Sequence, residues 1–285
     1  MKRRVVVTGM GIVSPLGNEV DIAYNNAING VNGISLIDSF DTSELKVKIA
    51  GQIKDFDPKK HLSGRDVRRQ DLYSQYAVNA AMDAFIDADL SGKYDPSKMG
   101  VILGTGMGGM GTLTRDLHKA FSEGYNKIPP MFIPMIIPNM ASGNVSIALN
   151  AKAHTTTVTT ACAAATNAIG DSFRLIRDGY ADIMVTGGSE AAVNPYTLSG
   201  FAALTALSTN ENPNEASRPF DKQRDGFVLA EGCGILILEE LEHALARNAH
   251  IYAEMIGYGA TSDAYHITAP SGIGATEAIR QAISD

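Results

Sequence analysis

The 285-residue chain is 45% hydrophobic and 19% charged, which is ordinary for a globular protein and sufficient for one large domain or two modest ones. Its net charge of −7 disfavours binding to nucleic acid or to an anionic membrane, and no apolar run reaches membrane-spanning length. The two cysteines lie far apart and give neither a disulfide framework nor a zinc-binding spacing. The first residues, Met-Lys-Arg-Arg, run directly into a strand and do not form a secretory signal. We therefore expect a cytoplasmic, reduced protein with no metal and no cofactor.

The hydrophobic pattern predicts strands alternating with helices. The expected strands are residues 4–8, which lead into a glycine turn, and then 99–103, 154–160, 183–186, 234–239 and 251–259. The expected helices are residues 23–28, 71–87, 113–123, 139–150, 163–177 and 240–247. Four prolines exclude a long helix at residues 128–138. This alternation predicts a layered α/β fold with a largely parallel or mixed sheet.

Cys162 lies at the junction between the β-branched run 154–160 and the small-residue helix that follows. At such a junction the N–H groups and the positive end of the helix dipole favour a thiolate, which is the nucleophilic form of cysteine. The sequence therefore predicts a nucleophile at Cys162. The alternative, a small buried cysteine of the core, is the usual fate of a free cysteine and stays open on position alone.

Five segments in order resemble the β-ketoacyl-[acyl carrier protein] synthases. They are RVVVTGMG at 4–11, GTGMGGMG at 104–111, TTACAAA at 159–165, VTGGSEA at 185–191 and SRPFDKQRDGFV at 217–228. The last is the most specific, and the likeness is greatest to the elongating type known as synthase II. It extends from residue 3 to about residue 268.

This resemblance implies a thiolase-like α-β-α-β-α layered fold made of two similar halves. Residues 1–250 would form the first half, which carries the nucleophile, and residues 251–285 would begin the second. The family's two catalytic histidine motifs, its catalytic lysine and its gating phenylalanine belong to the second half and do not occur in these 285 residues. We therefore expect the sequence to be part of a longer enzyme, and we expect this chain alone to be inactive in condensation.

The implied reaction is a decarboxylative Claisen condensation in fatty acid elongation, in which malonyl-carrier attacks an acyl chain bound to Cys162. The backbone N–H of Cys162 would supply one half of the oxyanion hole. His154 and His266 are the candidates to replace the missing histidines. We expect His154 to point away from the thiol and His266 to be hydrogen-bonded within its own loop.

The resemblance also assigns binding residues. Met107, Phe201 and Phe227 would line the acyl tunnel, Phe132 would reach into it from a second subunit, and Thr268 would contact the pantetheine arm. An acidic acyl carrier protein would meet Arg65, Arg68, Arg69 and Lys127. Thr205 stands where a further basic residue is often found. Alternatively, the residues assigned to the tunnel are ordinary core residues, and the basic residues form a solvent-exposed face with no partner. The family forms homodimers, and residues 155–160 would be the pairing edge.

Two functions from other classes compete with this one. The glycines at 104, 106 and 109 fit a dinucleotide-binding turn after a strand, as in NAD(P)-dependent oxidoreductases. Tyr94 and Lys98 imitate the reductase pair Tyr-x-x-x-Lys, although Pro96 opposes the helix that this pair requires. The other alternative is a non-catalytic partner subunit of a ketosynthase, against which the presence of Cys162 argues.

Overall fold

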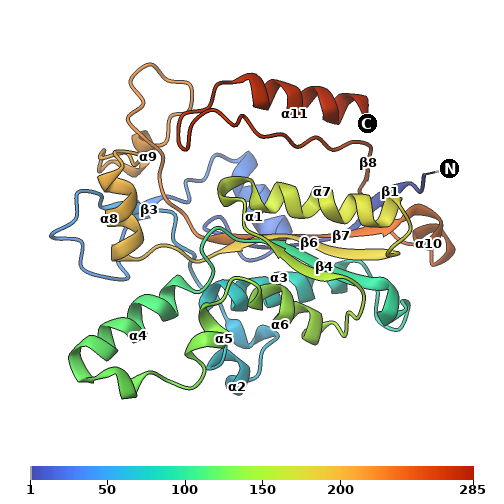
Figure 1. Cartoon of the computed structure of the whole chain (residues 1–285), viewed down its shortest axis with the longest axis horizontal. Coiled ribbons are helices and arrows are strands. Elements are labelled where there is room, and N and C mark those ends of the chain that lie inside the picture. Colours follow the sequence, from blue (N-terminus) through green and yellow to red (C-terminus); the bar gives the residue numbers. More distant parts are fainter. Residues whose placement is uncertain (1) are drawn as a thin grey trace.

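A computed structural model describes residues 2–285 of the protein, which are built around one mixed sheet (Figure 1). The sheet has six strands in the order β5-β4-β6-β7-β1-β8. These strands are β1 (Val5–Val13), β4 (Met99–Gly104), β5 (Thr155–Val158), β6 (Ile183–Glu190), β7 (Gly232–Glu240) and β8 (Ala253–Met255). Strand β4 pairs in parallel with β5 and β6, whereas the pairs β6–β7, β7–β1 and β1–β8 are antiparallel. The predicted layered α/β fold is confirmed, with a mixed sheet.

Helices cover both faces of the sheet, as Figure 1 shows, with α7 on one face and α3 and α6 on the other. The longer helices are α1 (Val20–Ile28), α3 (Leu72–Asp87), α4 (Met110–Glu123), α6 (Met140–Ala148), α7 (Ala164–Arg177), α8 (Pro195–Ala203) and α11 (Ile273–Ser284). The shorter ones are α2 (Gly64–Val67), α5 (Phe132–Ile136), α9 (Pro213–Ala216) and α10 (Leu241–Ala246). A two-stranded sheet joins β2 (Ser35–Leu36) to β3 (Ile49–Ala50). As predicted, the proline-containing segment 128–138 forms no long helix, although it contains the short helix α5, which was not predicted.

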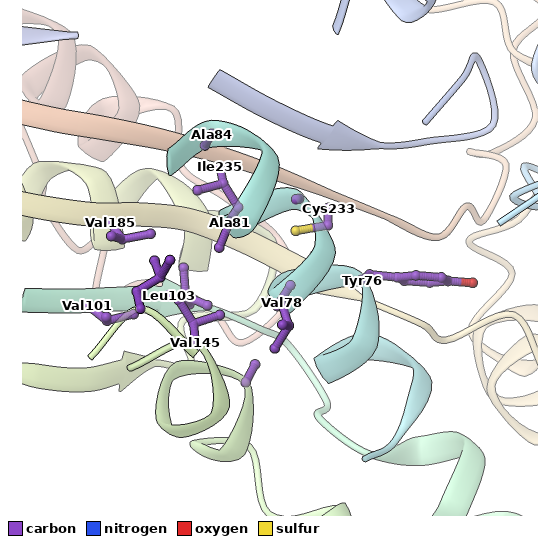
Figure 2. Close-up of a cluster of buried hydrophobic side chains, with 14 of the residues drawn as sticks. Tyr76, Val78, Ala81, Ala84, Val101, Leu103, Val145, Val185, Cys233 and Ile235 are labelled. Atoms are coloured by element: carbon purple, nitrogen blue, oxygen red, sulfur yellow. The ribbon is translucent and has the colours of Figure 1, made fainter. Parts of the chain in front are cut away.

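The alternation of side chains along β4 divides the core into two layers. Val101 and Leu103 belong to the cluster under α3 and α6, which Figure 2 shows together with Val145 and Ile235. Ile102, between them, belongs to the cluster under α7. All six residues of β4 are buried, because the strand lies between β5 and β6 and helices cover both of its faces.

Two predicted elements differ from the structure. The glycine turn expected after residue 8 does not form, and β1 continues to Val13 with an irregularity between Val7 and Gly9. Gly9 and Gly11 remain in the strand because they pair with Ile237 and Ile235 of β7. They are glycines because α3 crosses them so closely that a Cβ atom on either would overlap a carbonyl oxygen of α3.

The strand expected at 251–259 shortens to β8. Gly257 and Gly259 lie directly against the backbone of α11 at Ala282 and Ala278, so this part of the chain packs under a helix and is not paired in a sheet. Among residues 2–285, no helix is both long and apolar enough to cross a membrane.

Candidate active site

Cys162 is exposed on a single 3-10 turn, Ala161–Ala163, which connects the end of β5 to the first turn of α7. The alternative of a buried core cysteine is therefore wrong for this residue. Ala161 has φ = +49°, a left-handed conformation that costs a non-glycine residue about 1–3 kcal/mol. Such strain immediately before an exposed thiol at a helix N-terminus is the geometry that presents a nucleophile above the edge of a sheet.

Glycines at the carboxyl ends of β4 and β6 bring α7 close to the sheet at this point. A Cβ on Gly104 would overlap the backbone of Ala164, and one on Gly188 would lie 2.6 Å from the Cβ of Ala165. The first turn of α7 therefore packs directly on the ends of these two strands, and Cys162, on the turn before α7, lies next to them. These glycines belong to two of the sequence motifs, and close approach of two backbones is the physical reason for them.

A cavity of about 370 Å³ opens beside the thiol. It brings together Cys162 with Met107 and Phe201, two of the residues predicted for the acyl tunnel. The remaining lining residues are Gly104, Thr105, Gly106, Ala161, Ala164, Ala165, Gly188, Ser189, Glu190 and Gly232. Most of these side chains are small or apolar, which suits a flexible hydrocarbon chain.

Other predicted site residues lie outside this cavity. Phe227 does not line it but packs edge-to-face on Phe201, with ring centroids 5.4 Å apart. Phe132 begins α5 and does not line the cavity either. Thr268 is exposed in the loop before α11, and its N–H donates to Nδ1 of His266 at 3.1 Å. His266 also accepts from the N–H of Ala269 at 3.1 Å, so it is hydrogen-bonded within its own loop, as predicted.

Glu190 is a residue of the site to which the sequence assigned no role. Its Oε2 accepts hydrogen bonds from the N–H of Gly106 at 2.5 Å and of Met107 at 3.2 Å, and Thr105 Oγ1 donates to Oε1 at 3.3 Å. Burial raises the pKa of the Glu190 carboxyl above its ordinary value, against the opposing effect of these donors. The motif 185–191 contained Glu190, but its contact lies 84 residues away in sequence and no local pattern predicts it.

The same contacts bear on the dinucleotide-binding alternative. The turn that follows β4, residues 105–109, is here called the glycine turn. Four successive N–H groups of this turn already have acceptors: Gly106 and Met107 donate to Glu190, Gly108 to Thr105 and Gly109 to the carbonyl of Ile136. No N–H of these four is left to cradle a pyrophosphate. Residues 96–98 form a 3-10 turn and not the helix that a Tyr-x-x-x-Lys pair needs, as Pro96 predicted.

Three of the four basic residues predicted to bind the carrier protein lie in or directly after α2. Arg65 is in this helix, Arg68 and Arg69 follow it, and all three side chains are exposed, as is Lys127 at the end of a 3-10 turn. A hollow of about 830 Å³ is lined by Arg68 and Arg69 together with Pro129 and Pro130. The structure thus brings the segment that follows Lys127 next to Arg68 and Arg69. Thr205, where a further basic residue was expected, is exposed just after α8.

Residues 2–285 contain no group of three or more His, Cys, Asp or Glu side chains arranged to hold a metal ion. The second cysteine, Cys233, is buried on β7, and burial raises the pKa of its thiol to about 12. Cys162 is therefore the accessible thiol of the two.

Comparison with known proteins gives concordant matches. The family model "Beta-ketoacyl synthase, N-terminal domain" matches residues 2–244. The chain is 46% identical to 3-oxoacyl-[acyl-carrier-protein] synthase 2 of Staphylococcus aureus (strain COL) over 286 residues, and 48% identical to the protein of the same name from Synechocystis over 288 residues. These alignments cover 99% and 100% of this chain and 69% of each relative.

Solved structures agree with the sequence matches. The ishigamide ketosynthase/chain length factor superposes with a TM-score of 0.93 at 34% identity, and a β-ketoacyl synthase from Burkholderia phymatum with 0.89 at 32%. A type II polyketide ketosynthase, solved in complex with its acyl-carrier protein and bound to the hexaketide, gives 0.89 at 36%. Each match covers all of this chain and 70% of the other. The predicted thiolase-like fold class is confirmed, and the chain belongs to the β-ketoacyl synthase family.

Proposed function

We propose that the protein is a 3-oxoacyl-[acyl carrier protein] synthase of the synthase II type. The observation that carries this proposal is the exposed Cys162 on the turn that precedes α7, beside an apolar cavity lined by Met107 and Phe201. A nucleophile next to a cavity for a hydrocarbon chain is what a covalent acyl-enzyme requires. The 46–48% identity to two proteins of that name supports the same conclusion.

The first step is acyl transfer. The Cys162 thiolate attacks the thioester carbonyl of an acyl-carrier, a tetrahedral oxyanion forms, and its collapse breaks the bond to the carrier sulfur, which leaves as a thiolate and takes up a proton. N–H groups at the start of α7 would stabilise the oxyanion. The acyl chain then lies along Met107 and Phe201, whose flexible and aromatic side chains accommodate its methylene groups.

In the second step malonyl-carrier loses CO₂, and the resulting carbanion attacks the acyl carbonyl and expels the Cys162 thiolate. That step needs groups that stabilise the developing enolate, and the histidine motifs that provide them in the family are not among these 285 residues. The residues of this chain thus support acyl transfer, and condensation is assigned to the protein together with the family's second half. The division into halves at residues 1–250 and 251–285 remains part of this proposal.

The acyl carrier protein is the proposed macromolecular partner. Arg65, Arg68, Arg69 and Lys127 give a positive surface on a protein with a net charge of −7. Such a surface would steer an acidic carrier toward the active site more than it would tighten the final complex. The ketosynthase solved in complex with its acyl-carrier protein supports this assignment. Thr268 is proposed to contact the pantetheine arm, and the site of synthesis is proposed to be the cytoplasm.

A homodimer is proposed through β5. This strand is an edge of the sheet, and Thr155 and Thr156 are exposed. An unpaired strand edge can extend a sheet into a second subunit by hydrogen bonding. In that dimer, Phe132 of one subunit would reach the acyl cavity of the other, and Phe227 would support the cavity wall through Phe201. Sedimentation analysis should give a dimer, and a monomer at micromolar concentration would contradict this assembly.

The proposed function is tested by the release of free carrier thiol from a long-chain acyl-carrier thioester. The wild type and a Cys233→Ala variant should release one thiol per chain, because Cys233 is buried, whereas Cys162→Ala should release none. Equal release by Cys162→Ala and the wild type would overturn the proposal. A non-catalytic partner subunit, the remaining alternative, would release no thiol in any of the three proteins.

A further inference from the structure

A chain of side-chain hydrogen bonds crosses the turn that presents Cys162. Thr160 Oγ1 donates to Asn167 Oδ1 at 2.6 Å, and Asn167 Nδ2 donates to the Tyr258 hydroxyl at 2.6 Å. Thr160 precedes the nucleophile turn and Asn167 lies on the first part of α7, so the two residues enclose Cys162 in sequence. Tyr258 comes from the segment after β8, 91 residues further along the chain.

Tyr258 is fixed in place from several sides. Its ring is buried, with 6% of its surface exposed, in the core cluster under α7. A Cβ on Gly170 would overlap the ring, so this glycine makes room for it on α7. The Arg174 guanidinium lies 4.8 Å from the ring centroid, a cation–π distance. The neighbouring Gly257 and Gly259 lie against the backbone of α11.

We propose that Asn167 and Tyr258 are positioning residues that hold the Cys162 turn in its working geometry, an inference that rests on the proposed acyl transfer for its catalytic consequence. Ala161 has φ = +49°, and a strained residue keeps such a conformation only where its surroundings impose it. The hydrogen bond from Thr160 to Asn167 connects the residue before the turn to α7, and in this way it holds Ala161 in its strained conformation. Tyr258 fixes the Asn167 amide in the orientation that leaves Oδ1 facing Thr160.

The catalytic consequence follows from the nature of the site. The donors of an oxyanion hole act only when they lie within hydrogen-bond distance of the developing charge, so a small displacement of the turn weakens catalysis strongly. Alkylation by a small reagent needs an accessible thiolate but no oxyanion hole. Loss of the positioning chain should therefore slow acyl transfer far more than it slows alkylation.

The structural part is tested by amide hydrogen exchange at residues 161–164 in a Tyr258→Phe variant, which removes one oxygen atom. Exchange there should accelerate about fivefold, the loss expected for one hydrogen bond, with exchange in α3 unchanged. Tyr252→Phe is the matched control, because it removes a tyrosine hydroxyl of the same segment that donates to Asp87 at 2.9 Å and is not connected to the turn. Equal exchange in Tyr258→Phe and the wild type would overturn the proposal.

Asn167→Ala and the double variant Asn167→Ala/Tyr258→Phe show whether the two residues act through one chain. The double variant should exchange no faster than Asn167→Ala alone, because Tyr258 acts through Asn167. If the effects of the two substitutions on the exchange rate were additive, Tyr258 and Asn167 would not act through one series of hydrogen bonds, and the proposal would be contradicted.

The catalytic part is tested by two rates at Cys162. Tyr258→Phe should slow acyl transfer from an acyl-carrier thioester about tenfold and alter iodoacetamide alkylation by less than about twofold. Equal slowing of both rates would show a general structural role and overturn the positioning role. If the wild type accepts no acyl group, the proposed function fails, while the exchange experiment still decides whether Tyr258 holds the turn.

Discussion

The Glu190 carboxylate lies 2.5 Å from the backbone nitrogen of Gly106, and through this hydrogen bond β6 holds the glycine turn that carries Met107. Burial raises the pKa of Glu190, so the folded protein favours its protonated form more than the unfolded chain does. The contribution of this group to stability is therefore fully present below its unfolded pKa and is lost as pH rises through the folded pKa.

A Glu190→Gln variant should separate this contribution from the others, because the amide imitates the protonated acid at every pH. We expect the free energy of unfolding of the variant, relative to the wild type, to increase between about pH 4 and pH 7. Urea denaturation across this range measures the difference. A difference that is independent of pH, or that decreases as pH rises, would contradict the assigned pKa direction.

Local patterns predicted much of this molecule, and contacts between distant segments account for most of what they missed. Hydrophobic periodicity located α3, and the residue type of Cys162 at a strand–helix junction identified the candidate nucleophile. Sequence could not show that β1 pairs with β7 as far as Val13, where a turn was expected, nor that Gly11 lies against Ala80. Nor could it show that Glu190 serves as the acceptor for the glycine turn.

Gly11 is required by the close approach of α3 to β1. In Gly11→Ala the new Cβ would overlap the carbonyl oxygen of Ala80, and overpacking of this kind against a backbone should destabilise the fold by about 1–3 kcal/mol. Gly200→Ala is the matched control, because nothing lies within 4 Å of its Cβ position in α8. It should stabilise the fold by about 0.5–1 kcal/mol. Chemical denaturation of both variants gives the comparison, and similar effects would refute the packing argument.

Glu239 is the centre of a buried ionic network. It accepts hydrogen bonds from Arg247 at 2.8 and 2.7 Å, from Thr8 at 2.8 Å and contacts His243 at 2.5 Å. Burial alone would raise its pKa, but these partners together bring the pKa below the ordinary value. The stabilisation is thus present above the unfolded pKa and is lost as pH falls through the folded pKa.

Glu239→Gln leaves the guanidinium of Arg247 without a charged partner and should cost about 3–5 kcal/mol at neutral pH. Glu254→Gln breaks the exposed pair with Arg4, at 2.6 Å, and should cost far less, because solvent screens a pair of this kind. Thermal unfolding at neutral pH compares the two variants. If the Glu254 variant proved the less stable of the two, the buried network around Glu239 would not stabilise the fold more than the exposed pair does.

Arg68 should accelerate the encounter with the acyl carrier protein. Arg68→Glu is expected to lower the association rate about tenfold at low salt, with the effect shrinking as ionic strength rises. Arg280→Glu makes the same change of charge on α11, on the side of the sheet opposite α2 (Figure 1), and should leave the rate almost unchanged. Stopped-flow binding at several salt concentrations measures both. Equal losses would mean that net charge, and not this surface, governs the encounter.

The central claim is that Cys162 carries the acyl chain, and the intact mass of the protein tests it most directly. After incubation with a long-chain acyl-carrier thioester, the wild type should gain the mass of one acyl group, which peptide mapping should place on Cys162. Cys162→Ala should gain none. An unmodified wild-type mass, or an adduct that persists in Cys162→Ala, would contradict the account.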